Sequence, residues 1–336
     1  MIARKSTEHP PGGYRRDPLW PRIQEYLPEC VRLECDNLPT EEFVRVGEFL
    51  IHMDIYRAQT PCKQASSPEG QAQAPRGRIF LLHGVGGNGR LLSFLAVPFF
   101  RAGYEVICPD MPLYGYTEYS AVPTYDSWIV CIAAVIDRYG ADDVPTFLFG
   151  LSAGGMLAYE TGCRCSGVAG VLASCLLDLG DPTISCEVAS SPGFVKLSLK
   201  RETFLRRLAG NIRIPMRWVC NMKAIANDAS LAELLMADPK SAGAKVPVSF
   251  ALSLLDHHAQ IEPEDFTGCP VLLVHPGDDR WTDLRLSRNF YDRLACAKEL
   301  VVLDGGGHFP VEQTALGQMI DASLKFMEEH SRCQKE

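Results

Sequence analysis

Two patterns of apolar and polar residues follow one another along this chain. In residues 41–58, apolar and polar side chains alternate around Gly47, which predicts two antiparallel strands joined by a tight turn. From Arg78 onward, apolar segments of strand length alternate with amphipathic segments of helix length. Strands that are apolar throughout are typical of a parallel sheet covered by helices on both faces. The pattern therefore predicts an α/β fold with a mostly parallel sheet and a hairpin at its edge.

The alternation also gives the order of the expected elements. Strands are predicted at residues 78–84, 104–110, 145–150, 167–175, 269–279 and 298–308. Helices are predicted at residues 91–103, 125–140, 153–162, 283–294 and 312–329. The pattern breaks in residues 176–268, where amphipathic segments occur without a strand signal. We expect this segment to be a helical insertion that acts as a lid or cap on a core formed by residues 41–175 and 269–330.

The first 40 residues are expected to form an N-terminal tail and a short helix that packs on the domain. Residues 1–16 have no periodicity, which predicts a mobile tail. Asp17 and Pro18 then provide a helix N-cap and a first helical residue. Further along, residues 60–77 are rich in Pro, Ser, Gln and Gly, which predicts a flexible surface loop.

Composition narrows the class of protein. The 336 residues are 46% hydrophobic and 22% charged, values typical of a globular chain with a sizeable core. A formal net charge of -8 argues against a nucleic-acid partner. We expect no transmembrane segment, because no apolar stretch approaches about 18 residues, and a cytoplasmic location, because no secretory signal is recognisable. The 13 cysteines lack CxxC spacing, which favours core packing over a bound metal. Oligomeric state is left open.

A candidate nucleophile lies between a predicted strand and a predicted helix. Residues 150–154 read Gly-Leu-Ser-Ala-Gly, a G-x-S-x-G motif in the context that the motif requires. A nucleophile on such a sharp turn needs small neighbours, and Gly150 and Gly154 provide them. The N-terminus of the following helix favours negative charge that develops nearby. Ser152 is therefore the candidate nucleophile.

A serine hydroxyl needs a base, and the base needs a carboxylate that orients it. His308 follows the last predicted strand in a loop with three glycines, which makes it the candidate base. The acid is expected after the preceding predicted strand, where Asp278 and Asp279 are neighbours. Asp279 is preferred because it lies further out in the loop, whereas Asp278 is better placed to cap the turn. Asp178, which follows an earlier strand, is the remaining alternative.

Backbone N–H donors for a tetrahedral intermediate are expected from the glycine-rich residues 83–87 and from the start of the helix after the nucleophile. The N–H groups of Val85 and Ala153 are the expected oxyanion hole. A glycine-rich loop after a first strand can also bind phosphates. This loop matches no nucleotide-binding motif in full, so we expect no cofactor. His83 and His275 are interpreted as structural, and His257 as the end of an insertion helix.

Five segments in this order resemble the α/β-hydrolase superfamily, most closely its serine-aminopeptidase-like and monoacylglycerol-lipase-like branch. The segments are LLHGVGG, PDMPLYGYT, GLSAGG, HPGDDRWTD and GGGHFPVE, within residues 78–330. The order of nucleophile, acid and base, Ser152, Asp279 and His308, is also similar to that of the superfamily. The resemblance implies an α/β-hydrolase fold and a hydrolase of carboxylic esters or related acyl bonds that needs no cofactor.

The sequence thus predicts a serine hydrolase that acts through an acyl-enzyme. An acyltransferase with the same triad, and a ligand-sensing protein on the hydrolase fold, are the alternatives. Apolar side chains of the insertion, such as Phe194, Phe204, Trp218 and Phe250, favour a small-molecule substrate with a hydrophobic acyl group, if a few of them face the pocket.

Overall fold

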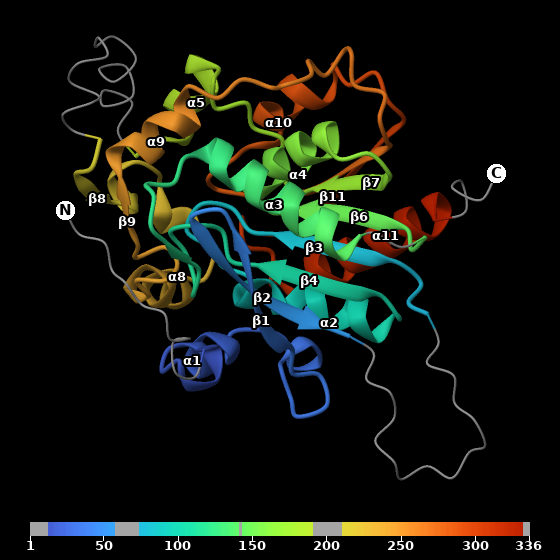
Figure 1. Ribbon diagram of the computed structural model, residues 1–336, viewed down its shortest axis with the longest axis horizontal. Coiled ribbons are helices and arrows are strands. Elements are labelled where there is room, and N and C mark those ends of the chain that lie inside the picture. The colour runs from blue at the N-terminus through green and yellow to red at the C-terminus, as the bar shows by residue number, and fades with distance from the viewer. Residues whose placement is uncertain (1–12, 58–73, 141–142, 191–209, 332–336) are drawn as a thin grey trace.

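A nine-stranded sheet organises the molecule (Figure 1). The computed structural model describes residues 13–57, 74–140, 143–190 and 210–331. The strands of the sheet are β1 (Thr40–Val46), β2 (Phe49–Tyr56), β3 (Arg78–Leu82), β4 (Glu105–Pro109), β5 (Glu118–Tyr119), β6 (Thr146–Gly150), β7 (Val168–Ala173), β10 (Val271–Pro276) and β11 (Lys298–Leu303). Their order is β1-β2-β4-β3-β6-β7-β10-β11, and β5 pairs with β2.

Along the order β4-β3-β6-β7-β10-β11 all neighbouring strands are parallel. Strand β2 pairs in antiparallel fashion with β1, β4 and β5. The predicted hairpin is confirmed, with Val46 opposite Phe49 across a turn that contains Gly47. Strands β3, β6, β7 and β10 are buried along their whole length, which explains their continuous apolar sequences. The structure confirms the predicted α/β class and its mostly parallel sheet.

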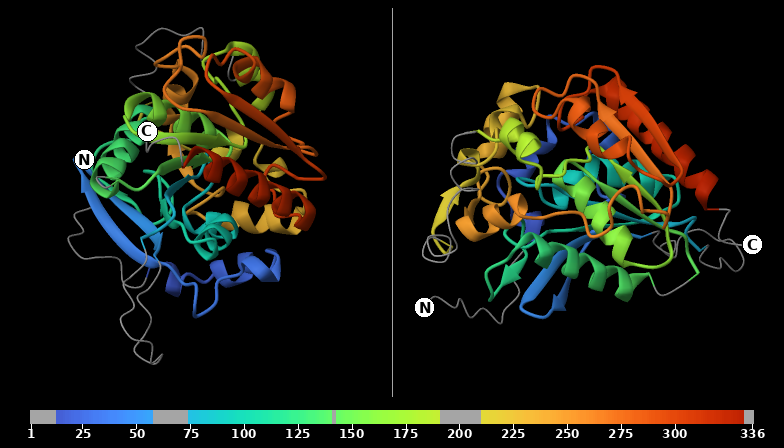
Figure 2. Two further views of the ribbon diagram at one scale, coloured as in Figure 1. Left: turned by 90° about the vertical axis from the view of Figure 1, so that its right-hand side faces the viewer. Right: turned by 90° about the horizontal axis from the view of Figure 1, so that it is seen from above.

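Helices cover both faces of the sheet. They are α1 (Trp20–Gln24), α2 (Ser93–Arg101), α3 (Tyr125–Tyr139), α4 (Ala153–Arg164), α5 (Pro182–Val188), α8 (Ala229–Ala237), α9 (Val248–Leu255), α10 (Leu284–Tyr291) and α11 (Gln313–His330). Helices α3 and α4 pack together, as do α2 and α11. In the left panel of Figure 2, α3 in green and α11 in red lie on opposite sides of the strands. The capping box of Thr124 and Ser127 fixes the start of α3.

The described residues between β7 and β10 contain strands as well as helices. Besides α5, α8 and α9, the described part of this segment contains two short 3₁₀ helices and a two-stranded antiparallel sheet of β8 (Arg213–Pro215) and β9 (Lys245–Pro247). The prediction that this segment holds no strand was wrong, because strands of three residues that end in proline leave no alternating pattern. Figure 1 shows α8, α9, β8 and β9 gathered at the end of the sheet where β3 and β4 terminate. The side chains of Phe194 and Phe204 lie outside the described residues.

Regular structure begins within the segment that was predicted to be a mobile tail, residues 1–16. Residues 1–12 lie outside the described part, but Gly13–Arg16 form a 3₁₀ helix and the Tyr14 side chain is buried. The predicted helix start was also wrong by a few residues, because α1 begins at Trp20. Asp17 nevertheless receives N–H groups at the helix start, since its Oδ1 accepts from Leu19 and Trp20 at 2.9 and 3.2 Å. The predicted surface loop of residues 60–77 falls mostly outside the described residues.

Two further observations concern composition. Cys108 and Cys131 are fully buried, as predicted for cysteines that pack in the core. In the described ranges, no helix combines the length and the apolar character that crossing a bilayer requires.

Two glycine substitutions in helices should change stability in opposite directions. A Cβ at Gly317 in α11 would meet nothing within 4 Å, so Gly317→Ala should raise the free energy of unfolding by about 0.5–1 kcal/mol. A Cβ at Gly155 in α4 would overlap the carbonyl oxygen of Cys175, so Gly155→Ala should lower it by about 2 kcal/mol or more. Urea denaturation of both variants checks this, and equal effects would contradict the packing described here.

Candidate active site

The turn between β6 and α4 carries Ser152 in a conformation that is rare for a residue with a side chain. Its φ is 56° and its ψ is -129°, which lifts the side chain above the end of the strand. A Cβ at Gly150 would overlap the carbonyl oxygen of Gly154, and a Cβ at Gly154 would overlap that of Leu82. The predicted need for glycine at both positions is confirmed, because backbone occupies the space of a side chain.

Ser152, His308 and Asp279 form one hydrogen-bonded chain. The distance from Ser152 Oγ to His308 Nε2 is 2.8 Å, and that from His308 Nδ1 to Asp279 Oδ2 is 2.8 Å. A carboxylate only accepts hydrogen bonds, so Nδ1 carries the proton and Nε2 is left to accept from the serine hydroxyl. Burial by itself would raise the pKa of Asp279, but the adjacent His308 and hydrogen bonds from Thr282 lower that pKa to about 2. Asp279 is therefore ionised at neutral pH.

The structure places the three candidate acids in different surroundings. Asp279 both contacts His308 and caps its own turn, because its Oδ1 accepts the N–H groups of Trp281 and Thr282 at 2.8 and 2.9 Å. The assignment of turn capping to Asp278 was wrong, and Asp278 is exposed. Asp178 accepts the N–H of Gly180 at 3.0 Å and lines a different pocket.

The two predicted oxyanion donors lie beside Ser152. Ala153 is the first residue of α4, where helix geometry leaves the N–H without an intrahelical acceptor. Val85 lies in the loop after β3, and a Cβ on the adjacent Gly84 would lie 3.0 Å from Ser152 Cβ and 2.9 Å from the Ala153 nitrogen. In the described ranges, neither N–H is bonded to a protein acceptor. Both donors are therefore available to a ligand beside Ser152.

His83 fixes the peptide plane that carries the Val85 N–H. Its Nε2 accepts the N–H of Met111 at 2.8 Å, so the ring proton sits on Nδ1 and is donated to the Gly84 carbonyl at 2.8 Å. Burial lowers the pKa of His83 to about 4, which keeps the ring neutral. The Gly84 carbonyl and the Val85 N–H belong to one planar peptide, so holding the first orients the second. The structural interpretation of His83 thus agrees with its contacts.

An apolar pocket opens at Ser152 and His308. Its apolar walls are Leu91, Leu92, Ile225, Leu235 and Phe309. Ile225 and Leu235 come from the segment between β7 and β10, which therefore contributes to the pocket. Trp218 and Phe250, two of the apolar side chains of which a few were expected to face the pocket, are not among its walls: Trp218 is 60% exposed, and Phe250 is buried against Trp128 with ring centroids 5.1 Å apart.

A second pocket lies on the other side of Ala153. It is lined by Tyr125, Met156, Leu177, Asp178, Leu254 and His257, among others. His257 does more than end a helix, because α9 already ends at Leu255 and Nε2 lies 3.2 Å from the buried Glu160 carboxylate. Its pKa is raised, since burial is outweighed by Glu160 and Asp126.

Two groups of metal-ligating side chains occur among the described residues, and neither suits a metal ion. Cys175 lies with Asp279 and His308, but burial raises the pKa of its thiol to about 12, so it is protonated at neutral pH. Glu41, His52 and Asp54 form the second group, whose carboxylates are already paired with Arg90.

The sheet topology and the strand–serine–helix turn define the α/β-hydrolase class. Residues 73–312 match the family model described as serine aminopeptidase, S33, and the chain therefore belongs to this family. The predicted resemblance is confirmed, and the protein is an α/β-hydrolase enzyme.

Individual relatives agree with this placement. The chain is 23% identical to phospholipase YtpA of Bacillus subtilis over 232 residues, which cover 67% of this chain and 84% of the relative. A soluble variant of the Saccharomyces cerevisiae monoglyceride lipase, solved with a substrate analog, has a TM-score of 0.71 at 18% identity, covering 90% of this chain and 98% of that one. The Paleococcus ferrophilus monoacylglycerol lipase has a TM-score of 0.59 at 21% identity, covering 76% and 96%. These structures share the fold.

Sequence reasoning missed two residues that hold the site. Thr282 donates its hydroxyl to Asp279 Oδ2 at 2.6 Å, and Ser174 accepts the Ser152 N–H with its Oγ at 2.9 Å. Thr282 is three residues after Asp279, so an Asx-type turn could have suggested it. Nothing in the sequence relates Ser174 to Ser152, because they meet only through the pairing of β6 with β7.

Replacing Asp279 and Asp278 by asparagine, one at a time, should show which of the two carboxylates acts on His308. Asp279→Asn presents an N–H₂ group to His308 Nδ1 and forces the wrong tautomer, so kcat on an activated ester should fall by about 10⁴. Asp278→Asn, a matched change at an exposed carboxylate, should stay within about tenfold of the unmodified protein. Steady-state kinetics of both variants check this, and a severe loss in Asp278→Asn with an active Asp279→Asn would reverse the assignment.

Proposed function

We propose that this protein is a serine hydrolase that cleaves a carboxylic ester or related acyl bond through an acyl-enzyme. The observation that supports the proposal is the continuous hydrogen-bonded chain from Ser152 through His308 to Asp279. The N–H groups of Val85 and Ala153, which bond to no protein acceptor among the described residues, add to it. In such a chain, His308 removes the proton from Ser152 as Oγ attacks the acyl carbon. Asp279 stabilises the imidazolium that forms, and it keeps His308 in the productive tautomer.

The N–H groups of Val85 and Ala153 meet the oxygen that becomes negatively charged in the tetrahedral intermediate. When the intermediate collapses, His308 returns the proton to the departing alcohol, and the acyl group stays on Ser152 as an ester. Water then attacks this ester with His308 again as base, which releases the acid and restores the serine. Every proton in the cycle passes through His308, so the reaction needs no cofactor.

The proposed substrate is a small molecule with a hydrophobic acyl group. Leu91, Leu92, Ile225, Leu235 and Phe309 make the pocket at Ser152 apolar, and an acyl chain would gain free energy by leaving water there. The names of the relatives, a phospholipase and two monoglyceride lipases, point to lipid esters as the substrate class. Because Ile225 and Leu235 belong to the segment between β7 and β10, we propose that residues 176–268 act as a lid or cap that selects substrates.

A fluorophosphonate probe tests the nucleophile. Ser152 should be labelled, because a base and two N–H donors surround its Oγ, and Ser152→Ala should lose both labelling and ester hydrolysis. Ser120→Ala, which removes an exposed serine hydroxyl, is the matched control and should keep both. Intact-protein mass spectrometry and an esterase assay give the readouts. Hydrolysis that persists in Ser152→Ala would refute the proposed mechanism.

A bulky side chain at Ile225 tests the acyl pocket. Ile225→Trp should fill the cavity and lower kcat/KM on long-chain aryl esters by about tenfold or more, while the acetyl ester changes by less than about threefold. Trp218→Ala, in the same segment but at an exposed position, should leave the ratio of long-chain to acetyl activity unchanged. A uniform loss on every ester in Ile225→Trp would show that this pocket does not hold the acyl group.

A further inference from the structure

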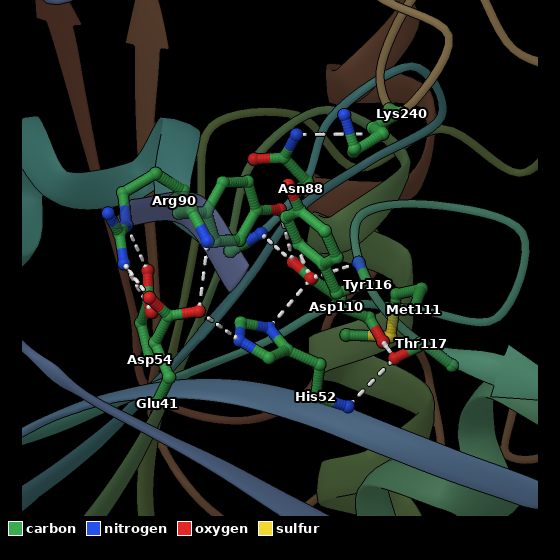
Figure 3. Close-up of polar contacts among 12 residues, drawn as sticks. Glu41, His52, Asp54, Asn88, Arg90, Asp110, Met111, Tyr116, Thr117 and Lys240 are labelled. Carbon is green, nitrogen blue, oxygen red and sulfur yellow. Dashed lines mark hydrogen bonds and ion pairs between the residues drawn. The ribbon is translucent and has the colours of Figure 1, made fainter. Parts of the chain in front are cut away.

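A buried cluster of charged side chains links the N-terminal segment to the loop that carries Val85 (Figure 3). Its centre is Asp110, which follows β4 and is fully buried. The carboxylate lies 2.8 Å from His52 Nδ1, and it accepts the N–H of Gly89 at 2.7 Å and that of Tyr116 at 2.8 Å. The Tyr14 hydroxyl donates to it at 3.0 Å. We call Tyr14, Glu41, His52, Asp54, Arg90 and Asp110 the hairpin cluster.

His52 connects two carboxylates within the hairpin cluster. Its Nε2 lies 3.0 Å from Glu41 Oε2, while its Nδ1 faces Asp110. Burial lowers the pKa of His52, but Asp110, Glu41 and Asp54 together raise it to about 10. His52 is therefore an imidazolium at neutral pH, and each ring nitrogen donates to one carboxylate. Without this cation, the fully buried Asp110 would lose its nearest counter-charge, which is costly in a buried site.

The loop of residues 83–90 is held at both ends by neighbouring residues. At its far end, Asp110 holds the N–H of Gly89, and Arg90 forms a two-pronged ion pair with Asp54 at 2.5 and 2.9 Å. At its near end, the N–H of Met111 holds His83, which in turn orients the peptide between Gly84 and Val85. Asp110 and Met111 are adjacent in the chain. A shift of Asp110 would therefore move both attachments of the loop together.

We propose that His52, acting through Asp110, is a positioning residue for the Val85 N–H of the oxyanion hole. The inference rests on the proposed function, because it assumes that Val85 donates to the reacting oxygen. It assigns a role in the reaction to the hairpin β1–β2, which lies before the matched residues 73–312. Figure 3 shows the ring of His52 between Glu41 and Asp110.

The hairpin cluster is polar, and this favours a role in positioning the loop that carries Val85 over a role that only attaches the hairpin β1–β2 to the rest of the protein. A hairpin can be docked by apolar packing alone, and replacing buried ion pairs with apolar side chains is often neutral or stabilising. Hydrogen bonds, in contrast, fix direction as well as distance. Asp110 uses its two oxygens to hold a ring, two backbone N–H groups and a hydroxyl, and one of those N–H groups belongs to the loop that carries Val85.

The test compares an oxygen ester with the matching thionoester in His52→Gln. Sulfur in the tetrahedral intermediate is larger and a weaker acceptor, so donors placed for oxygen favour the oxygen ester. In His52→Gln, kcat on a small activated ester should fall about tenfold with KM within about twofold, and the ester-to-thionoester rate ratio should fall about fivefold. A role in folding alone would reduce both rates equally, because it changes only the amount of native enzyme.

Arg57→Gln is the matched control. Arg57 follows β2 and pairs with Glu42 and Glu105 at 2.6 and 2.8 Å, so this variant also removes an ion pair of the hairpin, but one outside the cluster. Its rate ratio should equal that of the unmodified protein. If His52→Gln does not fold, Tyr14→Phe removes one donor to Asp110 while keeping the ring, and its ratio should fall about twofold.

A double variant shows whether His52 acts through Asp110. Asp110→Asn should lower the rate ratio at least as much as His52→Gln, and the double variant should be no worse than Asp110→Asn alone. An unchanged ratio in His52→Gln and Tyr14→Phe, or additive losses in the double variant, would overturn the inference. These results are separate from the proposed function, which fails if Ser152→Ala hydrolyses the ester as fast as the unmodified protein.

Discussion

The contact of backbone with backbone at the turn between β6 and α4 is the constraint on which the candidate site depends. A Cβ at Gly150 would meet the carbonyl of Gly154, and a Cβ at Gly154 would meet that of Leu82, so neither position has room for a side chain, and Ser152 between them has a positive φ. A residue in that conformation is strained, and the surrounding structure must hold it there. The Ser152 N–H bonded to Ser174 and the Gly155 N–H bonded to the Ser152 carbonyl do so on either side. The hydroxyl is thereby raised to where His308 can reach it.

Two buried carboxylates organise the surroundings of this turn in different ways. Asp279 is kept ionised by His308 and Thr282, and its role is local, since it touches the base directly. Asp110 is kept ionised chiefly by His52, and its hydrogen bonds extend to the loop that carries Val85. Burying each carboxylate costs desolvation free energy, which its hydrogen-bonding and charged partners offset. Asp279 orients the His308 ring, and Asp110 holds the loop that carries the Val85 N–H. The His308 ring and the peptide that carries the Val85 N–H are thus oriented by separate networks.

The segment between β7 and β10 shows where sequence patterns are least informative. Its amphipathic stretches predicted helices, and α8 and α9 are present, but β8 and β9 were missed because each has three residues. The sequence also did not show which apolar side chains reach the pocket: Trp218 lies at the surface and Phe250 in the core, whereas Ile225 and Leu235 line the pocket. Hydrophobicity indicates that a side chain avoids water, but it does not say which of several apolar environments receives it.

The sequence by itself determined the fold class, the edge hairpin, and the turn with its two glycines, because these features follow from local periodicity and from the space that a Cβ needs. It also placed His308 after the last strand, and Asp278 and Asp279 after the one before. Only the tertiary structure decided that Asp279 faces His308. The side chains of neighbouring loop residues point in different directions, and the sequence does not give those directions. The same holds for His52 and Asp110, which are 58 residues apart in the chain and meet because β2 pairs with β4.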